Sequence, residues 1–392
     1  MAQYYLILFA VALISTWWVF KKVLKIAILK NIVDNPDARK LQRTPVPVLG
    51  GMAVFFGMIV ALVTTGVFRE NYTLFAIMGI MTIMLYVGTM DDILSLSPRL
   101  RFIVQIIAVL LLVYSNDYSL NNFHGLWNIY QIPEWLAVPL TVVAGVGIIN
   151  AINLIDGVNG LSSGYCITAS AVFGMVFIIA DDRDAASLAI LSVGALIPFF
   201  FHNVFGKKSK MFIGDGGTLL MGTIMTSFVI GALNTDSPFA EKVDPNFGVI
   251  PFVLVVLVVP VFDCLRVMFT RILKGTSPFS PDKTHLHHLL IDLGFSHGGT
   301  TLTEILASLM AMLVWFVSYK LGASIDVQLY IVIAMGLLLT VGFYTWGRQQ
   351  QKKQTAMFRL MQKIGSLTQL QYDSRSLLRK IRNVLDNNMD LD

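Results

Sequence analysis

Apolar residues in this chain occur in long runs that are separated by short polar segments. Eleven of these runs are long enough to cross the roughly 30 Å hydrocarbon core of a membrane as helices. They cover residues 4–29, 46–68, 72–90, 100–115, 135–152, 162–180, 186–204, 217–233, 247–270, 301–319 and 328–347. No linker or internal repeat divides them, so the pattern predicts an all-α polytopic membrane protein with one transmembrane bundle over residues 1–347.

The composition supports a membrane location and the basic residues give an orientation. The chain is 55% hydrophobic and only 14% charged, and its mean hydropathy is +0.70, far from a soluble domain. Lys and Arg are retained on the cytoplasmic side of short loops. With the N-terminus outside and the C-terminus in the cytoplasm, only four of the 29 Lys and Arg residues lie outside: Arg69, Arg183, Lys242 and Lys320. We therefore predict this topology.

The basic residues also bear on partners and on the end of the chain. A net charge of +5 then gives a basic inner surface suited to membrane lipids with anionic headgroups and to phosphorylated substrates, rather than to nucleic acid. Residues 348–392 are polar and basic, with apolar residues at helical spacing from Met357 to Leu367. They predict a cytoplasmic amphipathic tail that lies on the membrane or pairs with a second subunit, without a catalytic role.

Four polar clusters fall at the inner ends of apolar runs in this topology. They are Asp91 with Asp92, residues 153–157, residues 214–217 and residues 285–288. Ionisable groups are costly near hydrocarbon, so four clusters at one membrane face indicate a shared site. Adjacent carboxylates such as Asp91 and Asp92 repel one another unless a cation or a shared proton offsets their charge. Since Mg²⁺ is often held by one or two carboxylates together with substrate phosphates, the pair suits metal binding, proton abstraction or one of each.

The next two clusters suit a nucleotide and its phosphates. Asn153, Asp156 and Asn159 stand three residues apart, so on a helical turn they would share a face that could hydrogen-bond a nucleobase, ribose or sugar. Capping and turn chemistry would place the same residue types there. Asp215 lies between glycines where a helix begins, a position that favours an anion. Asp215 is either an N-cap or, because the glycines allow a metal-bound pyrophosphate to approach the backbone, a ligand of the Mg²⁺ and not of the phosphate.

The histidine cluster and the first inner loop supply further candidates. His285, His287 and His288 could indicate zinc, but no Cys accompanies them and the other clusters offer oxygen ligands, so phosphate binding or proton transfer is favoured. Lys40 and Arg43 precede the run Pro-Val-Leu-Gly-Gly at residues 47–51. They are explained equally well by the inner topology of this loop and by phosphate binding.

In this combination and order, the motifs resemble those of the polyprenyl-phosphate N-acetylhexosamine-1-phosphate transferases. The resemblance spans residues 30 to 300 or so and includes the basic loop, Asp91 with Asp92, Asn-Leu-Ile-Asp-Gly at 153–157, Gly-Asp-Gly-Gly at 214–217 and Pro-Asp-Lys-Thr-His-Leu-His-His at 281–288. It implies an enzyme that uses Mg²⁺, or Mn²⁺ in its place, to transfer a sugar 1-phosphate from a UDP-sugar to a polyprenyl phosphate, releasing UMP.

The histidine motif is most similar to the branch that uses UDP-N-acetylglucosamine or a related UDP-N-acetylhexosamine. The resemblance therefore implies transfer of N-acetylglucosamine 1-phosphate to undecaprenyl phosphate, as the first step of a cell-envelope glycan. It also implies a multi-pass protein of the bacterial inner membrane, with its site facing the cytoplasm and with paired subunits as a homodimer.

The resemblance also assigns roles to single residues. It makes Asp215 a metal ligand, Asp91 and Asp92 the essential acidic pair that acts on the lipid phosphate or the metal, and Asn153 with Asp156 part of the nucleotide site. It makes His285, His287 and His288 contacts of the diphosphate, and Lys40 or Arg43 a contact of the lipid phosphate. The family often has Asp where this chain has Asn159, so any role at this position here depends on an amide and not on a charge.

Other interpretations remain open at this point. The same family includes the phospho-N-acetylmuramoyl-pentapeptide transferases of peptidoglycan synthesis, and membrane carboxylates beside glycine breaks are also found in ion-coupled transporters. Transporters usually bind their substrates near the midplane within paired repeats, whereas these clusters lie at helix ends. The chemical step is either direct attack by the lipid phosphate, which we favour, or formation of a phospho-aspartate on the acidic pair.

Overall fold

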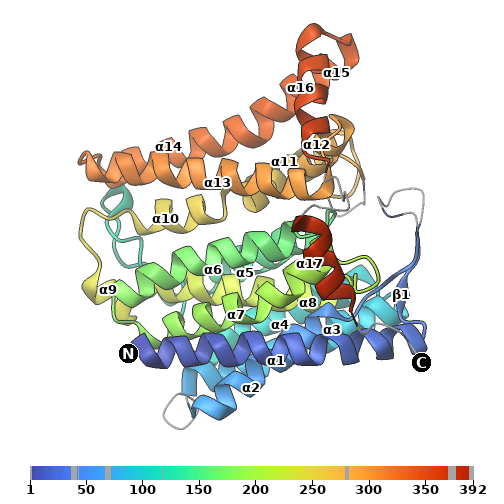
Figure 1. The fold of residues 1–392 in the computed structure, drawn as a ribbon. Helices are drawn as coiled ribbons and strands as arrows, with labels where there is room; N and C mark the ends of the chain where they lie inside the picture. The colour runs from blue at the N-terminus through green and yellow to red at the C-terminus, as the bar shows by residue number, and fades with distance from the viewer. Residues whose placement is uncertain are drawn as a thin grey trace.

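A computed structural model describes residues 2–36, 42, 44–66, 72–116, 118–278, 282–369 and 377–387. The predicted lipid-phosphate contacts Lys40 and Arg43 lie outside these residues. The described part is a bundle of helices whose only strands are β1 (Val33–Asp34) and β2 (Val46–Pro47), paired antiparallel. Figure 1 shows the long helices lying side by side, with β1 and α17 at the end opposite the N-terminus.

Each of the eleven predicted apolar runs contains a helix. They are α1 (Ala2–Leu29), α2 (Gly50–Thr65), α3 (Tyr72–Leu94), α4 (Pro98–Asn116), α5 (Glu134–Leu154), α6 (Leu161–Ile179), α7 (Arg183–Phe205), α8 (Gly214–Ala232), α10 (Val249–Val256) with α11 (Val258–Leu273), α13 (His297–Lys320) and α14 (Ile325–Leu337). Shorter elements are η2 (Leu126–Asn128), α9 (Pro238–Lys242), α12 (Leu286–Asp292), η3 (Leu338–Gly342), α15 (Phe343–Lys353), α16 (Ala356–Leu367) and α17 (Leu377–Asp386).

The helices confirm an all-α polytopic membrane protein. Within the described ranges, eight helices are long and apolar enough to cross a membrane, or nine if the bent pair α10 and α11 forms one span. Helix α2 has only 16 residues, and α8 is buried along almost its whole length inside the bundle. The count of eleven spans and the orientation of the termini stay predictions.

Glycines bring α2 and α3 into close contact with the central helix α8. A Cβ atom on Gly51 would lie 2.5 Å from the Gly217 Cα, and a Cβ atom on Gly88 would lie 2.5 Å from the Gly216 Cα. Both distances are too short for any side chain, so backbone meets backbone at these crossings. The glycines beside Asp215 thus serve helix packing, where the sequence alone had favoured the approach of a pyrophosphate.

The run at 247–270 is broken into two helices that meet at an angle of 78°. Pro260 has no N–H to donate to the carbonyl of Val256, four residues earlier, and the helix breaks at Leu257 between them. The Tyr165 hydroxyl donates a 2.8 Å hydrogen bond to that carbonyl oxygen, which keeps the buried group paired. The bend directs α11 toward the residues of the histidine cluster.

The described part of the C-terminal segment contains α15, α16 and α17. The span that begins at Ile325 continues to Lys353, beyond the boundary predicted at residue 347. Helix α16 buries Phe358 and Gly365 but exposes Met357, Leu360, Ile364 and Leu367. The amphipathic tail stays a prediction. Helix α17 packs on α7.

Candidate functional site

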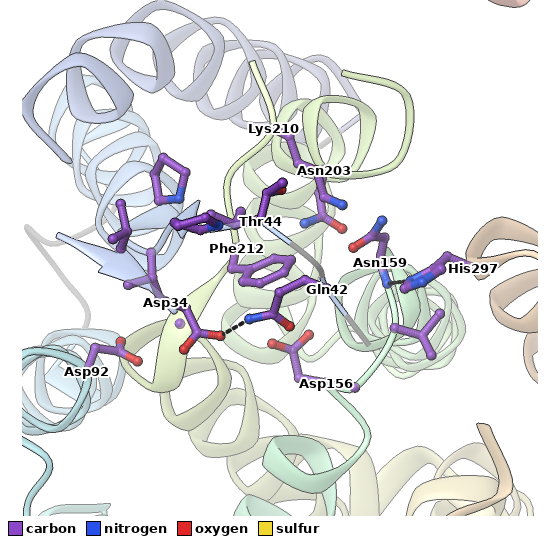
Figure 2. Close-up of a pocket in the computed structure, with 18 of the residues that line it drawn as sticks. Asp34, Gln42, Thr44, Asp92, Asp156, Asn159, Asn203, Lys210, Phe212 and His297 are labelled. Carbon is purple, nitrogen blue, oxygen red and sulfur yellow. Dashed lines mark hydrogen bonds between the residues drawn. The ribbon is translucent and has the colours of Figure 1, made fainter. Parts of the chain in front are cut away.

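A cavity of about 960 Å³ opens at one end of the bundle, beside β1. Six of the predicted site residues line it: Asp92, Asn153, Asp156, Asn159, Asp215 and His288. Figure 2 shows several of them, with Asp34, Gln42 and Lys210, around the same space. Asp91, His285 and His287 are buried behind the cavity wall, with 7%, 4% and 2% of their surfaces exposed.

The wall of this cavity joins the first inner loop to the start of α8. The Phe212 N–H donates a 2.8 Å hydrogen bond to the Pro47 carbonyl, and the Gly50 N–H donates a 2.9 Å hydrogen bond to the Phe212 carbonyl. The Gln42 amide donates to the Asp34 carboxylate at 2.6 Å, as Figure 2 shows. These bonds hold the Pro-Val-Leu-Gly-Gly segment against the residues that lead into Asp215.

Asp92 from α3 occupies the anion position at the N-terminus of α8. Its Oδ1 accepts a hydrogen bond from the Asp215 N–H at 3.1 Å, and its Oδ2 accepts one from the Gly216 N–H at 3.4 Å. Free N–H groups and the helix dipole favour a negative charge at this place. Asp215 itself lies in the first turn of α8 and is not the N-cap, which is Ile213. Its side chain is therefore available to the cavity.

Asp91 makes its hydrogen bonds with α4 and with the short segment before it. Its Oδ2 lies 2.7 Å from Arg101 Nη1, and its Oδ1 accepts a 2.7 Å hydrogen bond from the Leu96 N–H. The same Arg101 nitrogen lies 3.5 Å from Asp215 Oδ2. Arg101 thus links the acidic pair of α3 to the carboxylate of α8.

Asn153 holds the other side of Asp215. Its amide nitrogen donates to Asp215 Oδ1 at 2.9 Å and to the Thr218 hydroxyl at 2.7 Å. A second cavity of about 540 Å³ reaches Asn153 and Asp215 from the side of α4 and α11, and Arg99, Arg101 and Arg271 are in its lining. The two cavities therefore share Asn153 and Asp215.

Asp156 and Asn159 lie in the loop between α5 and α6. Burial raises the pKa of Asp156 to about 7, although a hydrogen bond from the Ser162 hydroxyl acts in the opposite direction. The Asn159 N–H donates to His297 Nδ1 at 3.2 Å, which leaves its side-chain amide facing the cavity (Figure 2). A carboxyl that titrates near neutral pH beside amides is suited to hydrogen bonding with a neutral polar ligand.

The three histidines have different surroundings. His285 Nδ1 lies 2.8 Å from Asp263 Oδ2, and Asp263 also pairs with Arg266 at 2.6 Å, so His285 belongs to a buried network. His287 packs against Gly157, where a Cβ atom would lie 2.3 Å from the histidine Nε2. His288 lines the main cavity, and burial lowers its pKa to about 4. His288 is therefore neutral at pH 7 and would act by hydrogen bonding and not by charge.

Comparisons with known proteins identify the family. The model of the family described as "Glycosyl transferase family 4" matches residues 74–233. A Bacillus subtilis protein, named "Probable undecaprenyl-phosphate N-acetylglucosaminyl 1-phosphate transferase", is 30% identical over 292 residues, which are 74% of this chain and 78% of that protein. The chain belongs to glycosyl transferase family 4.

Two further relatives are similar to the chain over nearly the same length. Proteins named "Undecaprenyl-phosphate alpha-N-acetylglucosaminyl 1-phosphate transferase" from Salmonella typhi and Yersinia pestis are 29% and 28% identical, over 78% and 74% of this chain and 81% and 78% of their own lengths. The matched segment 74–233 carries both members of the acidic pair and Asp215, while the histidine cluster lies beyond it.

The carboxylates fit the Mg²⁺ that the family resemblance implies. Asp92 and Asp215 face one cavity and offer only oxygen atoms, and Mg²⁺ usually takes one or two carboxylates and completes its ligands with phosphates and water. Among the residues placed by the structure, no group of three or more His, Cys, Asp or Glu side chains could hold a metal ion. Asp91 lines neither of the two cavities, so its predicted role as a metal ligand stays a prediction.

Sequence reasoning missed several cationic residues of the site. Lys207, Lys208 and Lys210, between α7 and α8, line the main cavity, and burial lowers the pKa of Lys210. In the sequence they counted only toward the inward bias of basic residues. The available signal was their position, because these three lysines lie close together just before Gly-Asp-Gly-Gly at residues 214–217. Arg101 gave no signal, because its role depends on a contact between α4 and α8 that no local pattern reveals.

Proposed function

We propose that this protein transfers N-acetylglucosamine 1-phosphate from UDP-N-acetylglucosamine to undecaprenyl phosphate and releases UMP. The names of its relatives in glycosyl transferase family 4 support this proposal. The observation that carries it is the meeting of two cavities at Asp215 and Asn153. A reaction between a soluble nucleotide sugar and a membrane lipid needs two routes to one reacting centre.

The main cavity suits the nucleotide sugar. It is large enough for a nucleotide sugar, since ligand pockets usually measure roughly 300–1,000 Å³. Asn153, Asp156 and Asn159 in its lining offer hydrogen bonds to uracil, ribose or sugar. Lys207, Lys208 and Lys210 line the same cavity and offer positive charge for the diphosphate. His288 adds a neutral hydrogen-bonding group.

The second cavity suits the phosphate of the lipid. Arg99, Arg101 and Arg271 line it, and Phe102 on α4, which is also in its lining, is 41% exposed. Cationic groups beside an exposed apolar side chain match an acceptor with a charged head and a hydrocarbon chain. Arg101 takes the role predicted for Lys40 or Arg43 in this arrangement, although those two residues stay candidates.

The chemical step that we favour is direct attack. An oxygen of the lipid phosphate forms a bond to the sugar-bearing phosphorus, the bond from that phosphorus to the bridging oxygen breaks, and UMP leaves with the electron pair. Mg²⁺, held by Asp92 and Asp215, would neutralise charge on the diphosphate. Arg101 orients the attacking phosphate, and Asn153 fixes the Asp215 carboxylate. Both oxygens of Asp92 accept backbone N–H groups, which makes Asp92 a poor nucleophile.

The finer description of the membrane arrangement is part of the same proposal. Eleven crossings would put the N-terminus outside and the cavity, with the C-terminal helices, in the cytoplasm. Figure 1 supports an odd number of crossings, because α17 and the N-terminus lie at opposite ends of the bundle. The bacterial relatives support the inner membrane as the location, where the enzyme would act as a homodimer that starts a cell-envelope glycan.

Purified protein incubated with undecaprenyl phosphate, Mg²⁺ and a panel of UDP-sugars tests this function. We expect UMP release and a lipid diphosphate sugar with UDP-N-acetylglucosamine, and loss of turnover on the order of a thousandfold in Asp215→Ala. Absence of product with every UDP-sugar would refute the proposed reaction. Isolation of a phosphorylated Asp91 or Asp92 that goes on to form product would refute direct attack.

A further inference from the structure

The last helix of the chain ends against the basic loop of the main cavity. Asp386 is the final residue of α17. Its carboxylate accepts hydrogen bonds from the Ser209 N–H at 2.9 Å, from the Ser209 hydroxyl at 2.8 Å and from the Lys207 N–H, which lies 3.2 Å from each carboxylate oxygen. The Arg382 side chain donates to the Phe205 carbonyl at 3.1 Å. In Figure 1, α17 lies in dark red across the end of α7.

An aspartate is poorly placed at this end of a helix unless other groups stabilise it. The C-terminus of a helix carries a partial negative charge, so a carboxylate there is repelled. Partial burial also acts to raise the pKa of Asp386, but the hydrogen bonds from Ser209 and the loop outweigh it and lower this pKa. The hydrogen bonds from the 207–209 loop therefore stabilise the ionised form of the Asp386 carboxylate. Leu385 beside it is 2% exposed, so α17 is packed in place and does not lie loosely on the surface.

The loop held by Asp386 is the one that brings three lysines to the cavity. Lys207, Lys208 and Lys210 all line the cavity, and Ser209 between them is fully buried. Neighbouring ammonium groups repel one another, and a short loop of long side chains loses entropy when it is ordered. A single carboxylate bound to the backbone at 207 and to both donors of Ser209 fixes the loop conformation in which these side chains face the cavity.

We propose that Asp386 is a positioning residue of the donor site, so that the C-terminal helix α17 completes the binding surface for the diphosphate of the nucleotide sugar. This inference rests on the proposed function for the identity of the diphosphate ligand. It goes beyond our expectation from the sequence, which gave the tail no catalytic role. The acceptor cavity shares no lining residue with the basic loop or with α17, so the effect should be confined to the donor.

The test compares four full-length proteins and one shortened protein. Asp386→Ala removes the acceptor, while Asp386→Asn keeps Oδ1, which receives most of the bonds from the loop. Asn383→Ala is the matched control, because Asn383 is exposed on the same helix. The shortened protein ends at residue 376 and has no α17. For each protein, KM is measured for UDP-N-acetylglucosamine and for undecaprenyl phosphate, and the affinity for inorganic pyrophosphate is measured without turnover.

We expect Asp386→Ala and the shortened protein to raise KM for the UDP-sugar roughly tenfold and to weaken pyrophosphate binding similarly, since a hydrogen-bonded charge is lost. KM for undecaprenyl phosphate and kcat should stay within about twofold of wild type. Asp386→Asn should fall between Asp386→Ala and wild type, and Asn383→Ala should match wild type. A general loss of structure would instead change both KM values and kcat.

Two results separate the inference from the proposed function. Unchanged KM for the UDP-sugar and unchanged pyrophosphate affinity, in both Asp386→Ala and the shortened protein, would overturn the role of Asp386. A wild-type protein that binds pyrophosphate but converts no UDP-sugar would refute the proposed function. In that case the pyrophosphate affinities alone still decide whether Asp386 positions the loop.

Discussion

Substitution of Gly88 by alanine should separate α3 from α8 and disturb the site at the same time. A Cβ atom on Gly88 would lie 2.5 Å from the Gly216 Cα and N atoms, against 3.4 Å for ordinary contact. The shortfall of about 0.9 Å concerns backbone atoms, which cannot rotate away, so the helices themselves must move. Asp92 lies one turn further along α3 and would shift with it relative to the Asp215 and Gly216 N–H groups.

The expected size of the effect follows from this displacement. Overpacking of a well-packed interior costs about 1–3 kcal/mol of unfolding free energy, and misplacement of catalytic groups by about 1 Å costs about a hundredfold in rate. Thermal unfolding in detergent and UMP release measure the two quantities. Gly79→Ala is the control, because Gly79 lies on the same helix and a Cβ atom there meets nothing within 4 Å. Wild-type turnover in Gly88→Ala would refute the argument that the α3–α8 contact sets the geometry of the site.

Three further predictions separate residues that the sequence grouped together. Asp91→Asn should raise KM for undecaprenyl phosphate about tenfold, because Arg101 loses its charged partner. Asp92→Asn should instead lower kcat about a hundredfold with little change in that KM. Steady-state kinetics that are the same for both variants would contradict separate roles for Asp91 and Asp92. His285→Ala should lower the unfolding free energy by about 1–3 kcal/mol by breaking its bond to Asp263, while His288→Ala should reduce turnover at unchanged thermal stability. The pKa of Asp156 is raised to about 7, so the folded protein binds the proton of this carboxyl more tightly than the unfolded chain does. The free energy of unfolding should therefore fall as pH rises from about 4 to about 7. Asp156→Asn should remove this contribution to the pH dependence of thermal unfolding.

The sequence predicted the class of fold well because hydrocarbon imposes a strong rule on composition. A helix that crosses the membrane must be apolar over its whole length, so each run from α1 to α14 could be located from residue type alone. The boundaries at breaks were harder to predict. Pro260 lies just after the break between α10 and α11, and the carbonyl that it leaves without a helical donor is bonded by Tyr165 on another helix, a contact that no local pattern shows. The burial of α8 depends likewise on glycines of α2 and α3.

The candidate site could be predicted in part. The motifs named residues that do meet in one cavity, since Asp92, Asn153, Asp156 and Asp215 all line it. They could not distinguish residues that face the cavity from residues that support it, because His285 and His288 have the same chemistry and differ only in their neighbours. The contribution of Asp386 was also hidden, since no local pattern connects position 386 to position 209.

The acidic pair illustrates why a shared motif need not mean a shared role. Consecutive residues on a helix do not face the same neighbour, and the hydrogen bonds of Asp91 and Asp92 accordingly go to different partners. Asp91 turns to α4 and Arg101, on the side of the second cavity, while Asp92 turns to the N-terminus of α8 and the main cavity. Arg101 then connects the two sides through Asp215. In the proposed reaction, Asp91 would therefore serve the acceptor and Asp92 the donor, and Arg101 on α4 would connect them through its contacts with Asp91 and Asp215.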